Sequence, residues 1–223
     1  NKLVRQAMNY AVDKDAIIRS ILQGYGRKLE GQLLSPEYFG YNPALKAYPY
    51  DAEKAKQLLA QAGYPNGFSI TMHSPAGRYP LDKEVTQAIA GYLERVGIRA
   101  QVRVIEWTTY LRMLFSKDLS PAGFIGMAVQ PEGAIMLSIQ QTGNISSYNA
   151  NREFDQVLLE ASKTFDPERR KRLYVRATQI LYDDPPGIFL YQQFDIYGAG
   201  KKVVGWKPRP DQLIDLAGVY LSN

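Results

Sequence analysis

The stretch that decides the fold is FSITMHSPAGRYPLDKEVTQAIAGYLERVGIRAQVRVIEW, at residues 68–107. Residues 68–72 alternate and are partly β-branched, which predicts a strand. Asp82 opens a helix that Gly97 ends. The apolar residues of this helix recur on one stripe: Val85, Ile89, Leu93 and Val96. Residues 98–105 alternate strictly enough to predict a second, half-buried strand. A strand, a helix and a strand form a βαβ unit with parallel strands and a right-handed crossover, so the sequence predicts an α/β fold.

Upstream of this unit, the sequence predicts three helices and one long loop. The first helix precedes Asp13, which is a good N-cap for a second helix that Gly24 ends. Residues 24–50 are rich in Gly, Pro, Tyr and Asn and have no helical or strand period, which predicts an ordered loop. Loops of this length are usually functional or contact a partner. Asp51 caps the third helix, which closes at Gly63.

Downstream, the pattern changes from regular elements to an irregular tail. Three more helices are expected, at residues 106–115, 152–163 and 167–181. Residues 123–129 are fully apolar, which predicts a strand in the middle of a sheet. Residues 188–197 predict a long extended segment. Residues 198–223 contain several Gly and Pro and no clear helix, so we expect a tail that packs against something outside this chain.

The composition excludes several classes of function. A chain of 223 residues with 45% hydrophobic and 22% charged residues is ordinary for a globular domain. No apolar run approaches the ~18–20 residues that a membrane-spanning helix needs. Cysteine is absent, which excludes disulfides and the usual structural zinc sites. His73 is the only histidine, so a Ser-His-Asp triad or a two-histidine metal site is not expected, and a packing or surface role is favoured.

The net charge of +5 and the pI near 9.2 permit binding to nucleic acid without requiring it. The densest basic cluster, at residues 169–176, is interpreted as a solvated helix face. Two competing hypotheses stay open. One is a nucleic-acid-binding α/β domain, which the charge motivates. The other is a hydrolase or transferase domain, which the βαβ unit alone motivates.

Four long stretches carry a resemblance to a known family. They are VRQAMNYAVDKDAII (residues 4–18), YNPALKAYPYDAEKAKQLLAQAGYPNGF (41–68), GRYPLDKEVTQAIAGYLERVGIRAQVRVIEW (77–107) and GNISSYNANREFDQVLLEAS (143–162). The chain resembles family 5 of the extracellular solute-binding proteins, which includes the dipeptide, oligopeptide and nickel receptors of ABC importers. The resemblance spans nearly the whole chain.

This resemblance implies a periplasmic-binding-protein-like (type II) α/β lobe, with a mixed β-sheet flanked by helices, from a two-lobed protein about twice this length. Residues 1–188 would be the second ligand-binding lobe. Residues 189–223 would be a hinge strand and a tail that crosses back to the missing first lobe. The implied protein is a periplasmic or lipid-anchored, extracytoplasmic monomer that works with membrane permease subunits. Its signal peptide would lie outside this chain, and no enzymatic activity, cofactor, metal or nucleic acid is expected.

The resemblance also implies a ligand site, in which this sequence departs from the family's pattern. Peptide-binding members carry a Trp-x-Ala-Asp-Tyr type sequence in the third strand, whose Asp pairs with the peptide ammonium. Aligning the following proline on Pro131 places Phe124 at the Trp, Gly126 at the Ala and Met127 at the Asp. A thioether does not pair with an ammonium. Either Glu132 or another acid takes over this anchor, or the cleft is apolar and binds a different solute.

The expected ligand contacts come from three segments: Phe124, Gly126 and Met127, then Arg78 and Tyr79, then Trp107 and Tyr110. Two interpretations of Arg78 stay open: it pairs with a ligand carboxylate in a bidentate manner, or it is an exposed loop arginine. Aromatic side chains offer rigid contact area, and those of tyrosine and tryptophan add a polar tip. The favoured solute is a peptide or a small amino-acid derivative, and the alternative is a non-peptide solute such as a sugar, an opine or a nickel chelate.

Overall fold

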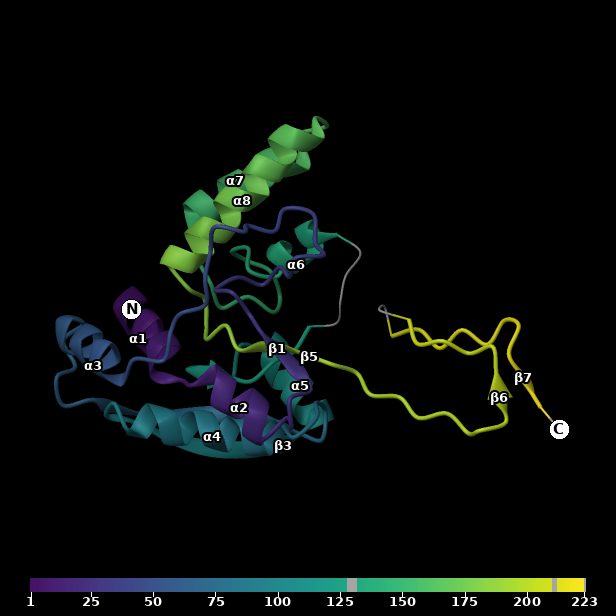
Figure 1. Ribbon diagram of the computed structural model, residues 1–223. Helices are drawn as coiled ribbons and strands as arrows, with labels where there is room; N and C mark the ends of the chain where they lie inside the picture. Colours follow the sequence, from purple (N-terminus) through teal and green to yellow (C-terminus); the bar gives the residue numbers. More distant parts are fainter. Residues whose placement is uncertain (128–131, 210–211, 223) are drawn as a thin grey trace.

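The computed structural model describes residues 1–127, 132–209 and 212–222. Figure 1 shows a body of two parts, from which the C-terminal segment extends away. The lower part contains the main sheet and α4, and the upper part contains α6, α7 and α8. None of the helices in the described ranges is long and apolar enough to cross a membrane.

The predicted βαβ unit is confirmed. Strand β2 (Phe68–Ala76) pairs in parallel with β3 (Ile98–Glu106), and α4 (Asp82–Glu94) connects them. The register runs without a break from Phe68 opposite Ile98 to Ala76 opposite Glu106. The strands begin at a tight approach of two glycines. A Cβ on Gly67, whose φ is +70°, would lie 1.8 Å from the carbonyl oxygen of Gly97, so only glycine fits there.

The expectation for residues 123–129 is wrong in length and in place. Strand β4 (Ala122–Gly123) has two residues and lies at the edge, because the sheet order is β3-β2-β4. Residues 124–127 have no regular secondary structure, and residues 128–129 lie outside the described ranges. The Tyr110 and Tyr79 hydroxyls donate to the carbonyl oxygens of Phe124 and Gly126. Side chains therefore satisfy backbone groups that a neighbouring strand would satisfy in a continuous sheet.

The three helices predicted upstream of the βαβ unit are confirmed and pack on the same core: α1 (Lys2–Ala11), α2 (Lys14–Ser20) and α3 (Ala52–Gln61). Their N-caps are Asn1, Asp13 and Asp51, and each cap side chain accepts a hydrogen bond from a backbone N–H of the first turn. The core beneath them is apolar and fully buried at its centre, where it includes Ala7, Ile17, Leu59, Val85, Leu93 and Ile98.

One charged side chain lies inside this part. Lys14 is 3% exposed, and its Nζ donates to the carbonyl oxygen of Asn9 at 2.6 Å and lies 3.4 and 3.5 Å from those of Val12 and Tyr48. Burial lowers the pKa of Lys14 to about 8, because removal from water disfavours the charged form. Lys14 thus ties α1, the start of α2 and the loop at Tyr48 together.

The upper part is helical and has its own core. Helices α7 (Arg152–Ser162) and α8 (Pro167–Asp183) confirm the two predicted helices, while the short α6 (Gly133–Ser138) was not predicted. Their core includes Leu34, Leu137, Phe154, Ala177 and Leu181. The predicted solvated face of α8 is confirmed at Arg169, Lys171, Arg172 and Arg176, which are exposed, whereas Arg170 is partly buried and lies over the Phe39 ring. Arg169 pairs with Glu160 at 2.7 Å and Arg176 pairs with Glu153, in both cases at exposed positions.

The long segment at residues 24–50 is ordered, but it is not only a loop. It contains β1 (Gly26–Lys28), which pairs antiparallel with β5 (Tyr191–Gln193). Strand β5 is the only strand within the predicted extended segment at residues 188–197. A three-residue strand without alternation escapes prediction, because its partner lies more than 160 residues away and no local pattern specifies the pair.

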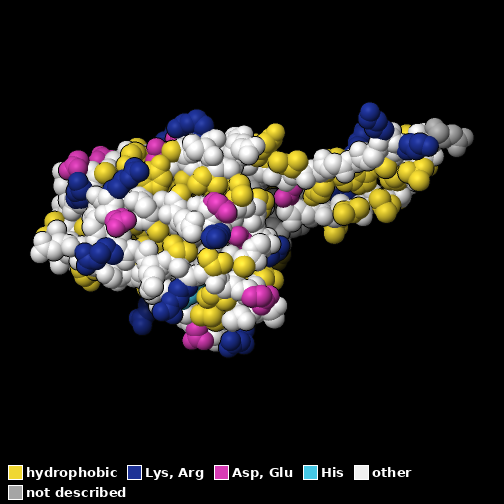
Figure 2. Space-filling model, turned by 90° about the horizontal axis from the view of Figure 1, so that it is seen from below, with side chains coloured by type: hydrophobic (Ala, Val, Ile, Leu, Met, Phe, Trp, Pro, Cys, Tyr) yellow, Lys and Arg dark blue, Asp and Glu magenta, His cyan; other side chains and the backbone are white. Residues whose placement is uncertain are grey.

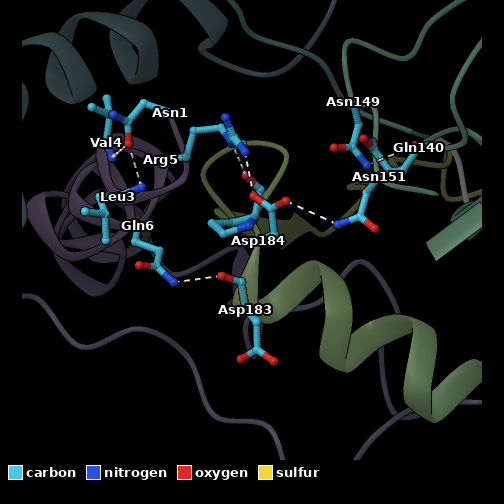
Figure 3. A network of polar contacts seen from close by, with 12 residues as sticks. Asn1, Leu3, Val4, Arg5, Gln6, Gln140, Asn149, Asn151, Asp183 and Asp184 are labelled. Atoms are coloured by element: carbon cyan, nitrogen blue, oxygen red, sulfur yellow. Dashed lines mark hydrogen bonds and ion pairs between the residues drawn. The ribbon is translucent and has the colours of Figure 1, made fainter. Parts of the chain in front are cut away.

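A polar network joins α1 to the end of α8 (Figure 3). Arg5 donates to the Asp184 carboxylate at 2.5 Å and to the carbonyl oxygen of Pro185 at 2.7 Å. The same carboxylate accepts from Asn151, the N-cap of α7, at 3.2 Å, and Gln6 donates to the carbonyl oxygen of Asp183. Asp184 therefore fixes the sheet part and the helical part to one another.

The segment after residue 197 differs from the body. Its regular structure within the described ranges is a pair of two-residue strands, β6 (Val203–Val204) and β7 (Tyr220–Leu221). Figure 2 shows hydrophobic side chains gathered along it. The most exposed of them are Leu213, Ile214, Leu216, Tyr220 and Leu221, each between 61% and 71% exposed. The division of the chain at residues 188 and 189 stays a prediction.

Candidate functional site

The candidate site lies where the three parallel strands end. After β2 comes the loop at residues 77–81, after β3 comes α5 (Trp107–Phe115), and after β4 come residues 124–127. The carboxyl ends of parallel strands are the usual place for ligands in α/β folds, because connecting loops converge there. The expected ligand contacts come from these three segments. We call this set the aromatic wall: Arg78, Tyr79, Trp107, Tyr110, Phe124, Gly126 and Met127.

Ring contacts connect the three segments of the wall. The Tyr79 ring lies edge-on to Phe124, with 5.7 Å between centroids, and edge-on to Trp107 at 6.2 Å. Trp107 stacks on Tyr110 at 5.9 Å with an interplanar angle of 19°. Such pairs stabilise their mutual orientation beyond the area that they bury. The sequence could name these residues, but only the fold brings them into one surface.

Arg78 extends over this surface. Its guanidinium carbon lies 5.3 Å from the Tyr79 ring centroid and 5.1 Å from that of Trp107, and the residue is exposed. Within the part of the chain that the structure describes, this guanidinium has no carboxylate partner. Stacking on two rings leaves the outer edge of a guanidinium available for a planar anion.

Asp82 holds the loop that carries Arg78 and Tyr79. Its buried carboxylate accepts from the backbone N–H groups of Gly77, Arg78 and Tyr79 at 3.3, 2.8 and 3.1 Å. The sequence identified Asp82 only as the start of a helix. Its role in the loop depends on the left-handed backbone of Leu81, at φ +54°, which turns the loop back over the helix start. An acid at the first position of a helix gives no local signal of that turn.

Gly126 and Met127 form the outer edge of the wall. The Tyr79 hydroxyl donates to the carbonyl oxygen of Gly126 at 3.0 Å, and a Cβ on Gly126 would lie 2.8 Å from the Tyr79 ring. Burial raises the pKa of Tyr79, so this hydroxyl stays protonated and donates at neutral pH. Met127 is 41% exposed and follows directly. The wall therefore presents a thioether and a cation to solvent.

Phe124 and Tyr110 lie deeper. Phe124 is 8% exposed, and Tyr110 is fully buried with its hydroxyl 2.7 Å from the Phe124 carbonyl oxygen. Burial raises the pKa of Tyr110. Tyr110 therefore supports Trp107 and Phe124 from within. The role of all seven residues as ligand contacts stays a prediction.

The acids nearest to the wall are engaged by backbone amides. Glu106 accepts from Thr108 N and Thr109 N at 2.8 and 3.1 Å at the start of α5, and these hydrogen bonds lower its pKa. Asp82 is engaged as described above. Glu132, the sequence-based alternative for an ammonium anchor, precedes α6, and its charge acts on Tyr174 of the helical part.

His73 is buried within β2, in agreement with a packing role. No group of three or more His, Asp or Glu among the described residues is arranged to hold a metal ion. A hollow of about 420 Å³ is lined by Pro80 and Leu81, which follow Tyr79 in the chain, but by none of the seven wall residues. The rest of its lining comes from residues 21–25, which follow α2, and from residues 193–197, with apolar side chains that include Ile21, Tyr25, Phe194 and Tyr197.

The chain is similar to known bacterial solute-binding proteins. Residues 1–147 match the model of a family described as bacterial extracellular solute-binding proteins, family 5, middle. Heme-binding protein A of Haemophilus influenzae is 34% identical over 219 residues, which cover 94% of this chain and 40% of that protein. The glutathione-binding protein GsiB of Escherichia coli K12 is 30% identical, over 95% of this chain and 43% of that protein.

A solved structure has the same fold. The ABC transporter-associated periplasmic binding protein DppA from Helicobacter pylori, in complex with the peptide STSA, matches with a TM-score of 0.80 at 30% identity. The match covers all of this chain and 44% of that one. The predicted fold class, an α/β lobe of the periplasmic-binding-protein kind, is therefore confirmed. The chain spans less than half of the length of these relatives.

Proposed function

The chain belongs to family 5 of the bacterial extracellular solute-binding proteins, and from that premise we propose that it captures a solute for an ABC importer. The observation that carries the proposal is the aromatic wall. Seven residues chosen from three separate stretches of sequence lie at one edge of a parallel sheet, and ring or hydrogen-bond contacts link six of them. Such a surface of rings, with the Arg78 guanidinium stacked over it, suits the binding of a small organic anion.

We further propose that this chain supplies one of two lobes between which the ligand is held. In this proposal, residues 1–188 are the lobe, and residues 189–223 are the hinge strand and the tail that crosses to the other lobe. Two observations support it: the relatives are more than twice as long, and the tail exposes apolar side chains that the body does not cover. A two-lobed receptor closes by hinge motion, and its ligand shifts the population toward the closed state.

For the ligand, the wall favours a solute with a carboxylate. Arg78 is available for bidentate pairing, while Asp82 and Glu106 already accept backbone hydrogen bonds. The favoured class is a peptide-like solute or a small amino-acid derivative. The curated names of two relatives, a glutathione-binding and a heme-binding protein, are consistent with organic acids as a class. The alternative is a non-peptide solute, such as a sugar, an opine or a nickel chelate, held mainly by the rings.

The remaining parts of the proposal follow from the family. The protein is extracytoplasmic, delivers its ligand to membrane permease subunits, acts as a monomer and catalyses no reaction. The relatives in the comparisons are binding proteins. On α8, Arg169 and Arg176 are paired with glutamates, which reduces the positive charge that this face offers to a nucleic acid, while Lys171 and Arg172 are exposed.

The test is a ligand screen, by thermal unfolding, on the parent protein, which is the full-length protein of which this chain is proposed to be one lobe. We expect peptides or amino-acid derivatives with a free carboxylate to raise the melting temperature, and a ligand at 100-fold excess over its Kd stabilises by about 2.7 kcal/mol. Arg78→Gln should abolish the shift for carboxylate ligands. Arg99→Gln is the matched control, because it removes the same charge from an exposed position at the other end of β3.

Three outcomes would contradict the proposal. If no solute of any class shifts the melting temperature, solute capture is wrong. If Arg78→Gln and Arg99→Gln behave alike, the carboxylate assignment is wrong. Binding to generic DNA that weakens steeply with salt would favour the nucleic-acid hypothesis instead.

A further inference from the structure

His73 makes hydrogen bonds next to the aromatic wall with both its side chain and its backbone carbonyl group. It lies in the central strand β2, opposite Arg103 on one side and Gly123 on the other, and it is 6% exposed. Its ring Nδ1 lies 3.3 Å from the carbonyl oxygen of Leu119 and 3.2 Å from that of Ala122. Both neighbours are acceptors only, so Nδ1 carries the proton and donates to the two carbonyl groups.

The backbone of the same residue reaches the wall directly. The His73 carbonyl oxygen accepts from Phe124 N at 2.9 Å, and the Tyr110 hydroxyl lies 3.4 Å from it. That hydroxyl also donates to the Phe124 carbonyl oxygen. His73 therefore contacts the turn that leaves α5, the strand β4 and the first residue of the wall after β4.

These contacts matter because β4 cannot hold the wall by itself. The strand consists of Ala122 and Gly123, and its ladder with β2 has two residue pairs. Isolated pairings of this length are marginal in water. Its preceding turn contains Pro121, which has no N–H to donate to a neighbouring carbonyl group. The His73 imidazole supplies a donor at that place, where the carbonyl groups of Leu119 and Ala122 converge.

We propose that His73 is the positioning residue of the aromatic wall. Through its Nδ1–H it fixes the turn between α5 and β4, and so sets Phe124 and the residues after it against Tyr79 and Trp107. The relevance of this role to ligand capture rests on the proposed function. The role itself concerns the geometry of the wall and is tested without a ligand.

The first test uses the unmodified chain. Because His73 is the only histidine among these 223 residues, a long-range ¹H–¹⁵N spectrum of this histidine-labelled chain contains the signals of one imidazole. We expect the neutral ring to be protonated at Nδ1. Protonation at Nε2, the form favoured by free histidine, overturns the proposal even if every substitution of His73 prevents folding.

The second test compares two substitutions of similar polarity. The amide nitrogen of Asn superposes on the position of Nδ1, whereas that of Gln reaches toward Nε2. The reporter is Trp107, made the single tryptophan by Trp206→Phe in the tail. We expect H73N to keep the acrylamide quenching constant of Trp107 near that of the same chain with His73. We expect H73Q to raise the quenching constant about two-fold, because the wall opens locally.

Far-UV circular dichroism and the melting temperature control for folding of each variant. Rescue by H73N alone supports a positioned Nδ1 donor. Equal quenching in the chain with His73, in H73N and in H73Q overturns the proposal. An equal rise in both variants also overturns it, because it would indicate that only the volume of the imidazole ring matters. These readouts do not depend on a bound solute, so a failed ligand screen and a failed role for His73 are distinguishable.

Discussion

The body and the tail contain similar proportions of apolar residues, but the body buries many of them and the tail leaves many of them exposed. In the body, side chains such as Leu93 and Ile98 are fully buried between α4 and the sheet. In the tail, Ile214 and Leu216 are 68% and 63% exposed, and the strands beside them have two residues each. Hydrophobicity alone does not distinguish these regions. The difference is whether the chain itself supplies the covering surface.

The two regions also differ in how far their own sequence specifies their structure. The body carries caps, helical stripes and a parallel strand pair that support one another, so it is specified from within. The tail carries apolar residues without a period that would pair them with one another. In the proposal of two lobes, the surface that covers these residues is the other half of the receptor.

The largest effect is expected where the body is most tightly packed. Leu93→Ala removes a fully buried side chain from α4 and leaves a cavity against β2 and β3, so we expect a loss of about 2–5 kcal/mol in the free energy of unfolding. Urea unfolding followed by circular dichroism measures it. A loss no larger than that of an exposed substitution on the same helix, such as Lys83→Ala, would contradict the idea that the body is closed.

A smaller effect, with a defined pH window, is expected from Lys14. Its pKa is lowered to about 8 in the folded body, from 10.5 when exposed. Between these values the unfolded chain binds more protons than the folded chain, so stability rises with pH. Below pH 8 both states are protonated and the contribution is flat.

We therefore expect the free energy of unfolding of the unsubstituted chain, relative to that of Lys14→Met, to increase by ~1 kcal/mol per pH unit above pH 8. The measurement is urea unfolding of both proteins from pH 6.5 to 9.5. Tyrosines with raised pKa values titrate in both proteins, so the difference between the two isolates Lys14. A difference that stays constant over the whole range would mean that the Lys14 amine is solvated.

The smallest effect is expected in the tail. Ile214→Ser and Leu216→Ser replace exposed apolar side chains, so the free energy of unfolding of this chain should change by less than about 0.5 kcal/mol. The same pair in the parent protein should cost several times more if the other lobe covers them. Equal small changes in both proteins would mean that the tail is uncovered there too.

The sequence predicted the elements that local patterns specify. Asp13 and Asp51 are the helix caps that the sequence predicts, and each accepts a backbone hydrogen bond in the first turn of its helix. The stripe of α4 and the alternation of β3 predicted the parallel pair. These features depend on neighbours within a few residues, so one segment of sequence contains the information that they need.

The elements that escaped prediction depend on distant partners. Strand β1 exists because β5 pairs with it, and residues after Gly123 leave the sheet because the tyrosines at 79 and 110 satisfy their carbonyl groups. The members of the aromatic wall were predicted through resemblance. The supports behind them, Asp82 and His73, were not, because their partners are backbone atoms whose position only the fold sets.

The network at the end of α8 has a consequence for how this chain is made. Asn9 of α1 donates to the carbonyl oxygen of Gly187, and Gln6 to that of Asp183, across 178 and 177 positions of the chain. The entropy of closing such a loop grows only with the logarithm of its length. During translation, however, these bonds wait until residue 187 has left the ribosome. Helix α1 therefore completes its polar contacts only after residues 183–187 have been synthesised, and until then Gln6 and Asn9 lack these partners.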